Sequence, residues 1–197
     1  MSGEDPAAGR APRILVGACG SVAVLNLHEY LLALRSRLGC ELRVLITASA
    51  ERFIRPDAVR LFCDDVVSCA PEPGLHRNHA ELADWADALL VLPATANILG
   101  EAACGLAGSP LSAAILAAAR PVSFFPNMHH SMWENPAVQR NVATLTADGH
   151  VVVPPVVRRA YQVARRSTTV SATLPDPADV VKIVADLLAK RPPAHRQ

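Results

Sequence analysis

The chain has 197 residues, a length that suits one well-buried domain and is short for two. Hydrophobic residues make up 51% and aromatic residues only 4%, so the core is expected to be aliphatic, as where helices pack on a parallel sheet. The 19 Lys and Arg residues nearly balance the 18 Asp and Glu residues, which gives no electrostatic reason to expect nucleic acid or a membrane as partner.

The ends of the chain and its cysteines place further limits. No segment approaches the roughly 20 apolar residues that a membrane-spanning helix needs. Residues 1–12 and 191–197 are expected to be disordered tails around one domain, 13–190. The five cysteines contain no CxxC pair and are odd in number, which indicates reduced thiols in a cytoplasmic protein rather than a disulfide framework or zinc site.

Strands and helices are predicted to alternate along the chain. In chain order the pattern predicts a strand at 14–16, a helix at 25–38, a strand at 42–47, a helix at 50–54 and a brief strand at 66–67. A helix at 79–86, a strand at 88–92, helices at 98–106 and 111–119, a strand at 121–125, a helix at 136–147, a strand at 150–153 and a helix at 179–188 follow. This order predicts one three-layer, doubly wound α/β domain, Rossmann-like or flavodoxin-like, with a parallel sheet of about six strands.

The turn after the first strand reads Gly17-Ala18-Cys19-Gly20-Ser21. Its glycines allow a tight strand-to-helix turn, in which backbone amides and the Ser21 hydroxyl would point at an anion. It is neither a Walker A loop nor a GxGxxG fingerprint, so an ordinary βα turn stays an equal alternative.

The turn after the second strand carries two further hydroxyls, on Thr47 and Ser49. A hydroxyl at this place can cap the following helix or bind a phosphate. Because ligands bind at the carboxyl ends of such sheets, two hydroxyl-bearing turns side by side modestly favour a phosphate.

A third segment, His79-Ala80-Glu81-Leu82-Ala83-Asp84-Trp85-Ala86-Asp87, leads into a strand that ends in Pro93-Ala94-Thr95-Ala96-Asn97. Small residues there let the backbone approach a planar ring, and Asn97 offers both a donor and an acceptor. A single histidine is more often a surface or structural residue. His76 and His79 lie three residues apart, but no convincing ligand set surrounds them, so no metal is expected.

These motifs resemble those of the homo-oligomeric flavin-containing cysteine decarboxylases. The H-x-E-L-x-x-W-A-D run followed by P-A-T-A-N carries the resemblance, and residues 126–133, PNMHHSMW, are similar to the P-x-M-N-x-x-M-W motif of that family. The family includes phosphopantothenoylcysteine decarboxylase and the peptidyl-cysteine decarboxylases of lanthipeptide biosynthesis. The likeness covers about residues 14–155.

The resemblance implies FMN, with FAD as the other option, and His79 as the active-site base. It implies a peptide substrate whose C-terminal cysteine is oxidised by the flavin and loses carbon dioxide, giving an enethiol for aminovinyl-cysteine formation. It also implies a homo-oligomer, either a trimer or a trimer-based dodecamer. The implied flavin-binding residues are Gly20, Ser21, Val22, Thr47, Ser49, Phe53, Pro93, Ala94, Thr95, Ala96 and Asn97, and the implied substrate-binding residues are Asn127, Met128, His129, Met132, Arg158 and Arg159.

The chain departs from the family pattern in two places. His129 stands where the motif has Asn, which keeps a carboxylate donor but leaves room for a different substrate or an inactive flavin binder. No cysteine follows Cys104, whereas phosphopantothenoylcysteine decarboxylases carry a downstream cysteine that helps to reduce the enethiol. Residues 156–167, with four arginines, are interpreted with equal weight as a flap over the peptide or as a solvated loop.

Three alternatives to a peptidyl-cysteine decarboxylase remain open. Phosphopantothenoylcysteine decarboxylation is disfavoured by the missing downstream cysteine. A prenyl-flavin-making transferase is disfavoured by His79 and the M-W motif. A catalytically silent flavoprotein that acts as a binding partner or regulator is kept open by His129.

Overall fold

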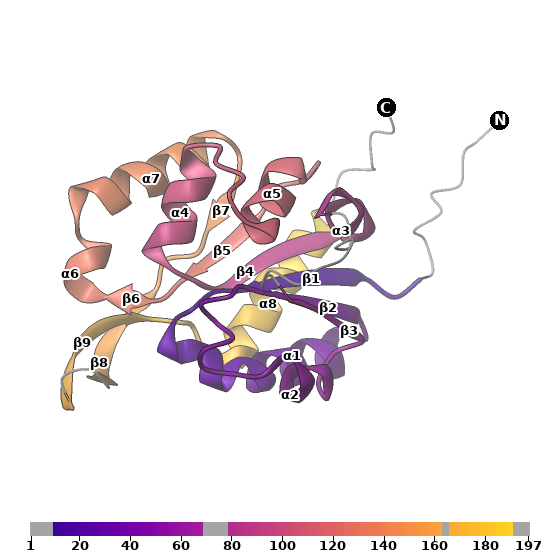
Figure 1. Ribbon diagram of the computed structural model, residues 1–197, viewed down its shortest axis with the longest axis horizontal. Helices are drawn as coiled ribbons and strands as arrows, with labels where there is room; N and C mark the ends of the chain where they lie inside the picture. The colour runs from indigo at the N-terminus through magenta and orange to yellow at the C-terminus, as the bar shows by residue number, and fades with distance from the viewer. Residues whose placement is uncertain (1–9, 69–78, 163–165, 191–197) are drawn as a thin grey trace.

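A parallel sheet of six strands forms the centre of the molecule, in the order β3-β2-β1-β4-β5-β7 (Figure 1). The computed structural model describes residues 10–68, 79–162 and 166–190. Every neighbouring pair of strands is parallel, which confirms the predicted sheet. The strands are β1 (Arg13–Ala18), β2 (Glu41–Ile46), β3 (Asp65–Ser68), β4 (Ala88–Ala94), β5 (Ser123–Pro126) and β7 (Val151–Val152).

Helices cover both faces of this sheet, so the domain has the three layers that the sequence predicts. Figure 1 shows α4, α5 and α7 on one side of the sheet and α1 and α2 on the other. Alternate residues of β1 separate two apolar cores: Ile14 and Val16 pack toward α1 and α8, and Leu15 packs toward α3, α4, α5 and α7. The helices are α1 (Leu27–Leu38), α2 (Pro56–Arg60), α3 (His79–Trp85), α4 (Ala96–Ala103), α5 (Pro110–Ala117), α7 (Pro136–Ala147) and α8 (Pro177–Ala189).

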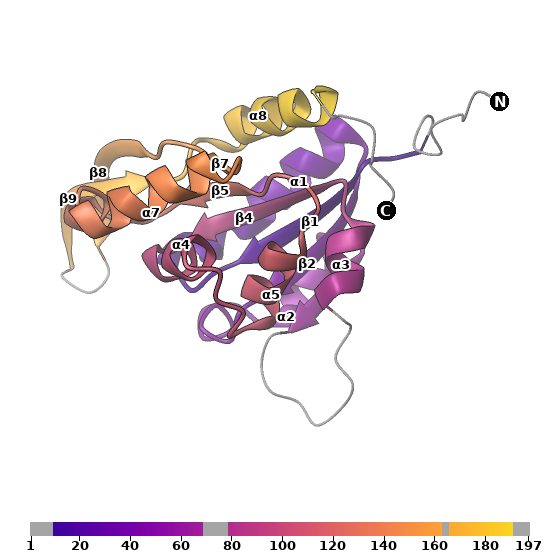
Figure 2. The same ribbon diagram turned by 90° about the horizontal axis from the view of Figure 1, so that it is seen from above.

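A second, antiparallel sheet lies beyond the carboxyl ends of the parallel strands. It consists of β6 (Met128–His129), β9 (Ser167–Thr173) and β8 (Val156–Gln162), in that order. Figures 1 and 2 both show β8 and β9 projecting from this end of the molecule. We refer to β8 and β9 together as the hairpin. Two short helices, η1 (Val22–Asn26) and α6 (His130–Trp133), flank the same end.

Three sequence expectations differ from the structure. Residues 50–54 form turns instead of the predicted helix. The helix α2 begins later, at Pro56, because the first N–H groups of a helix have no partner within it and proline, which has no N–H, is favoured there. Of the two interpretations of residues 156–167, the solvated loop is wrong, because residues 156–162 form β8, which pairs with β9; the flap stays a prediction. Strand β4 also continues through Pro93 to Ala94, beyond its predicted end.

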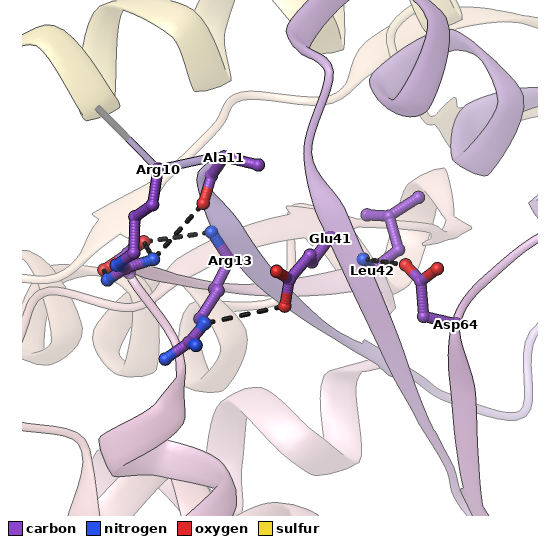
Figure 3. A network of polar contacts seen from close by, with 7 residues as sticks. Arg10, Ala11, Arg13, Glu41, Leu42 and Asp64 are labelled. Carbon is purple, nitrogen blue, oxygen red and sulfur yellow. Dashed lines mark hydrogen bonds and ion pairs between the residues drawn. The ribbon is translucent and has the colours of Figure 1, made fainter. Parts of the chain in front are cut away.

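A polar network holds the amino ends of the first strands together (Figure 3). The guanidinium of Arg10 donates to both carboxylate oxygens of the buried Asp87, at 2.7 and 2.8 Å. Arg13 pairs with Glu41 at 3.5 Å, and Asp64 accepts from the backbone of Leu42 at 2.7 Å. The segment expected to be a tail is therefore anchored from Arg10 onward. Residues 1–9 and 191–197, where the rest of the predicted tails fall, lie outside the described residues.

No helix in the described ranges is long and apolar enough to cross a membrane. Cys40 and Cys63 are buried, Cys104 is exposed, and none of these three forms a disulfide. Cys69 lies outside the described residues.

Candidate functional site

The turns after β1 and β2 touch each other, and a glycine makes this contact geometrically feasible. A Cβ atom at Gly20 would lie 2.6 Å from Ser49 Oγ and 2.8 Å from the Ser49 carbonyl carbon. A displaced side-chain oxygen could relieve the first contact, but the second is with backbone. Gly20 therefore brings Ser21 and Ser49 to one place at the carboxyl edge of the sheet.

The hydroxyls of these turns have different roles. Thr47 Oγ1 donates to the carbonyl of Ala18 at 3.1 Å and accepts from the backbone N–H of Ala50 at 3.3 Å. Its contact with Ser49 Oγ, at 3.2 Å, is then one in which Ser49 donates. Thr47 fixes the turn, while the exposed Ser49 hydroxyl can rotate toward a ligand.

The turn between β4 and α4 lies beside the Ser21 turn. Pro93 and Ala94 are buried; the Pro93 carbonyl accepts from the Cys19 N–H at 3.3 Å, and the Ala94 carbonyl accepts from the Asn127 N–H at 2.9 Å. Thr95 caps α4. The exposed side chain of Asn97 donates one amide N–H to Glu101 at 2.7 Å, so its second N–H and its amide oxygen remain for a ligand.

A cleft of about 560 Å³ separates η1 and the start of α1 from the hairpin. Its walls are mostly apolar or neutral, and Arg158 is the only permanently charged side chain among its described lining residues. Ser21 and the 127–129 segment form part of the wall, so the turn predicted to bind an anion lies next to the predicted substrate segment. The lining residues are Ser21, Val22, Ala23, Leu25, Asn26, Tyr30, Asn127, Met128, His129, Arg158, Ala160, Tyr161, Ser171, Thr173 and Leu174.

His129 serves as the N-cap of α6 while its ring lines the cleft. Its Nδ1 atom accepts from the backbone N–H of Ser131 at 3.2 Å and lies 2.7 Å from Ser131 Oγ. A neutral ring that accepts at Nδ1 carries its proton at Nε2. His129 can thus donate one neutral N–H to a ligand, as an asparagine amide would.

The hairpin separates the two arginines that the sequence placed together. Arg158 lines the cleft and donates to Thr173 Oγ1 at 2.8 Å, the Leu174 carbonyl at 3.2 Å and Asp176 Oδ1 at 3.3 Å. Three of its five N–H donors are therefore used within the fold, and one on each terminal nitrogen remains. Arg159 is exposed and, being the next residue of the strand, points to the other face of the hairpin.

Tyr30 lines the cleft although the sequence pattern does not predict it as a site residue. Its hydroxyl donates to the Pro175 carbonyl at 2.9 Å, and burial raises its pKa to about 12, although the charge of Arg158 acts in the opposite direction. In the sequence Tyr30 falls on the apolar side of α1 and looks like core. Three consecutive β-branched residues, 168–170, favour a strand in this segment, and they are the sequence signal for two further lining residues that were not predicted, Ser171 and Thr173.

Several predicted site residues do not line this cleft. His79 begins α3 and is exposed. Met132 and Phe53 are 47% and 43% exposed and lie outside the cleft wall, as does Arg159. Thr47, Ser49 and residues 93–97 lie at the same sheet edge but on the turns beside the cleft.

A flavin phosphate fits the paired turns. Two serine hydroxyls flank the place where a side chain at Gly20 would clash, and no acidic side chain lines the adjacent cleft among the described residues. The residues that would hold the phosphate are Ser21 and Ser49, with Thr47 fixing the second turn.

Comparison with known proteins agrees with this chemistry. The family model described as Flavoprotein matches residues 3–189. Mersacidin decarboxylase of Bacillus sp. (strain HIL-Y85/54728) is 40% identical over 152 residues, 77% of this chain and 78% of that protein. Phosphopantothenoylcysteine decarboxylase of Mus musculus is 36% identical over 162 residues, 78% of each chain.

A solved structure gives the same result for the fold. A variant of the peptidyl-cysteine decarboxylase EpiD, complexed with the substrate peptide DSYTC, superposes with a TM-score of 0.81 and 27% identity. The superposition covers 89% of this chain and 99% of that one. With its doubly wound sheet, paired hydroxyl turns and matching family model, the chain belongs to the Flavoprotein family.

Proposed function

We propose that this protein is an FMN-dependent peptidyl-cysteine decarboxylase that acts on a ribosomally made peptide ending in cysteine. One observation carries the proposal: the cleft wall formed by Asn127, Met128 and His129 adjoins the Ser21 turn. A peptide carboxylate and a flavin phosphate would therefore bind within one continuous site. The product would be the enethiol from which an aminovinyl-cysteine ring is made.

Bound flavin supplies an acceptor for two electrons, so that the cysteine residue loses carbon dioxide and two hydrogens in total. The residues of this chain bind and orient the reactants. Ser21 and Ser49 hold the phosphate, and the turn over residues 93–97 offers small side chains to the ring. The Nε2–H of His129 donates to the substrate carboxylate, and the apolar cleft walls exclude water.

His79 is proposed as the base that takes the proton released with the two electrons, acting on the site of a neighbouring protomer. This assignment is supported by its place at the exposed start of α3, away from the cleft of its own chain. The protein would then be an obligate homo-oligomer, a trimer or a trimer-based dodecamer, because each cleft is incomplete without a second copy.

The test uses the protein purified with its flavin and a peptide that ends in cysteine. We expect mass spectrometry to show loss of one carbon dioxide and two hydrogens, and no change for the same peptide ending in serine. A colourless protein that added FMN does not restore would overturn the flavin proposal. If the protein is yellow but the peptide is unchanged, the decarboxylase proposal is wrong and the protein is a catalytically silent flavoprotein.

Phosphopantothenoylcysteine is the second candidate substrate, since the mouse relative acts on it by name. The absence of any cysteine after Cys104 argues against it, because no thiol is available there to reduce the enethiol. We expect the peptide to react with the higher kcat/KM. The reverse order would replace the proposed substrate.

A further inference from the structure

We propose that Asn127 is a positioning residue that couples occupancy of the Ser21 turn to the hairpin over the cleft. The inference rests on the proposed function only in taking the ligand of the Ser21 turn to be a flavin phosphate. It concerns contacts that Asn127 makes with three separate parts of the fold.

Asn127 follows β5 and reaches in three directions. Its backbone N–H donates to the Ala94 carbonyl at the end of β4, at 2.9 Å. Its Nδ2 donates to the carbonyl of Ala172 in β9, at 3.3 Å. Its Oδ1 accepts a short hydrogen bond from the Ser21 hydroxyl. One side chain thus connects the turn after β1 to the hairpin.

These contacts fix which atoms donate. The Ala172 carbonyl can only accept, so the amide nitrogen of Asn127 must face it, and Oδ1 must face Ser21. Ser21 Oγ also accepts from the N–H of Ala23 at 3.3 Å. Ser21 therefore donates its one hydroxyl proton to Asn127.

A phosphate oxygen is also only an acceptor at this position. To bind it, Ser21 has to turn its single proton from Asn127 to the phosphate. The Asn127 amide then loses one of its two side-chain anchors, and its hold on Ala172 weakens. Cofactor binding would thereby loosen the hairpin and open the cleft to the peptide, so that the peptide enters the loaded protein.

Hydrogen exchange of residues 167–173, together with FMN affinity, tests this coupling. In the unaltered protein we expect FMN to speed exchange of this segment by about fivefold, the effect of losing one hydrogen bond. In Asn127→Ala the segment exchanges fast with or without FMN. This variant also binds FMN about fivefold more tightly, because Ser21 gives up no bond.

Two further variants separate the roles of Asn127. Asn127→Asp still accepts from Ser21 but cannot donate to Ala172. We therefore expect hydrogen exchange of residues 167–173 in this variant to be independent of FMN, and its affinity for FMN to be lower. Thr168→Val, an exposed change on β9 away from Asn127, keeps the response of the unaltered protein. A residue that merely supports the flavin site would give weaker FMN binding in Asn127→Ala.

The outcomes distinguish this inference from the proposed function. FMN that binds the unaltered protein without changing exchange of residues 167–173 overturns the coupling alone. The same holds if Asn127→Ala binds FMN more weakly and its hairpin still responds. A protein that takes up no FMN overturns both.

Discussion

At the scale of single residues, His129 combines a structural and a binding task. Its Nδ1 caps α6, and the residue lines the cleft, so Nε2–H is the donor that it can offer to a ligand there. An asparagine can divide the same tasks between its oxygen and its nitrogen, because the oxygen can accept from Ser131 and the nitrogen can donate to a ligand. The departure from the family motif at this position therefore preserves a neutral donor.

This equivalence makes a prediction for two variants. His129→Asn should keep kcat/KM for a cysteine-terminated peptide within about threefold, because cap and donor both remain. His129→Leu should lose roughly 10- to 100-fold, the value of a hydrogen bond to a charged group. Steady-state kinetics by mass spectrometry measures both. Equal losses in the two variants would show that His129 does not act as a neutral donor.

Tyr30 links the cleft to alkaline stability. Its pKa is raised from 10.0 to about 12, chiefly by burial, so the folded state favours the neutral phenol. The stability from this shift, on the order of 2–3 kcal/mol, is fully present below pH 10 and is lost as the pH rises to about 12. Burial raises the pKa of Cys40 and Cys63 to about 11, but these thiols are common to any Tyr30 variant and its parent.

The effect of Tyr30→Phe on the free energy of unfolding should change sign as the pH rises. At neutral pH the variant should be less stable by about 1 kcal/mol, because the bond to the Pro175 carbonyl is lost. As the pH rises from 10 toward 12, the difference should close and change sign, as measured by urea unfolding at each pH. Tyr161→Phe, at a side chain 63% exposed, is the matched control and should follow the parent. If the difference in unfolding free energy between variant and parent stays constant from pH 10 to 12, ionisation of Tyr30 does not cause the loss of stability.

At the scale of elements, Arg158 fastens the hairpin to the segment before α8. Its guanidinium joins β8 to Leu174 and Asp176, and the partners of the ion pair are 47% and 69% exposed. An exposed pair of this kind contributes under about 1 kcal/mol to global stability. Its local effect is larger, because the bonds to Leu174 and Asp176 join β8 directly to the segment before α8.

Arg158→Met should therefore leave the urea midpoint almost unchanged while hydrogen exchange of residues 167–173 becomes several times faster. Arg159→Met removes the same charge from the opposite face of β8 and should change neither quantity. If both variants speed exchange alike, net charge rather than the three hydrogen bonds of Arg158 holds the hairpin.

The elements also differ in how well the sequence predicts them. Continuous aliphatic runs such as 14–16 and 88–92 predict buried parallel strands, and α7 has its predicted bounds because Pro136 and Asp148-Gly149 mark its ends. The hairpin could not be recognised from its arginines, since Arg158 and Arg159 are polar on both faces of a strand that packs on no core. Residues 50–54 have helical propensity but form turns. The close contact between Ser49 and Gly20, which the sequence does not reveal, has the larger influence on this segment.

The candidate site shows the same division. The sequence predicts that the two hydroxyl turns lie together, because the order of strands along the chain brings the turns after β1 and β2 to one edge of the sheet. The sequence predicts only six of the fifteen described residues of the cleft wall; Tyr30, for example, comes from a helix whose periodicity indicates core. Which arginine faces the cleft depends on strand alternation that is visible only after β8 is paired.

At the scale of the whole molecule, the position of His79 predicts that activity requires two copies. In the described chain His79 lies at the start of α3, whereas the cleft lies between η1 and the hairpin. If the histidine acts on a neighbour's cleft, two inactive variants can restore each other in a mixed oligomer. His79→Asn supplies intact clefts, and Gly20→Ala supplies intact histidines, because its Cβ contact of 2.8 Å with Ser49 backbone disrupts the phosphate turns.

Each variant alone should be inactive, the first with flavin and the second without it, as absorbance will show. When equal amounts are co-expressed, roughly a quarter of the sites should pair an intact cleft with an intact histidine, and decarboxylation should return in proportion. Gly108→Ala, where a Cβ meets nothing within 4 Å, is the control that a glycine replacement by itself leaves flavin bound. A mixed oligomer that binds flavin and stays inactive would place His79 in its own chain's site or outside the reaction.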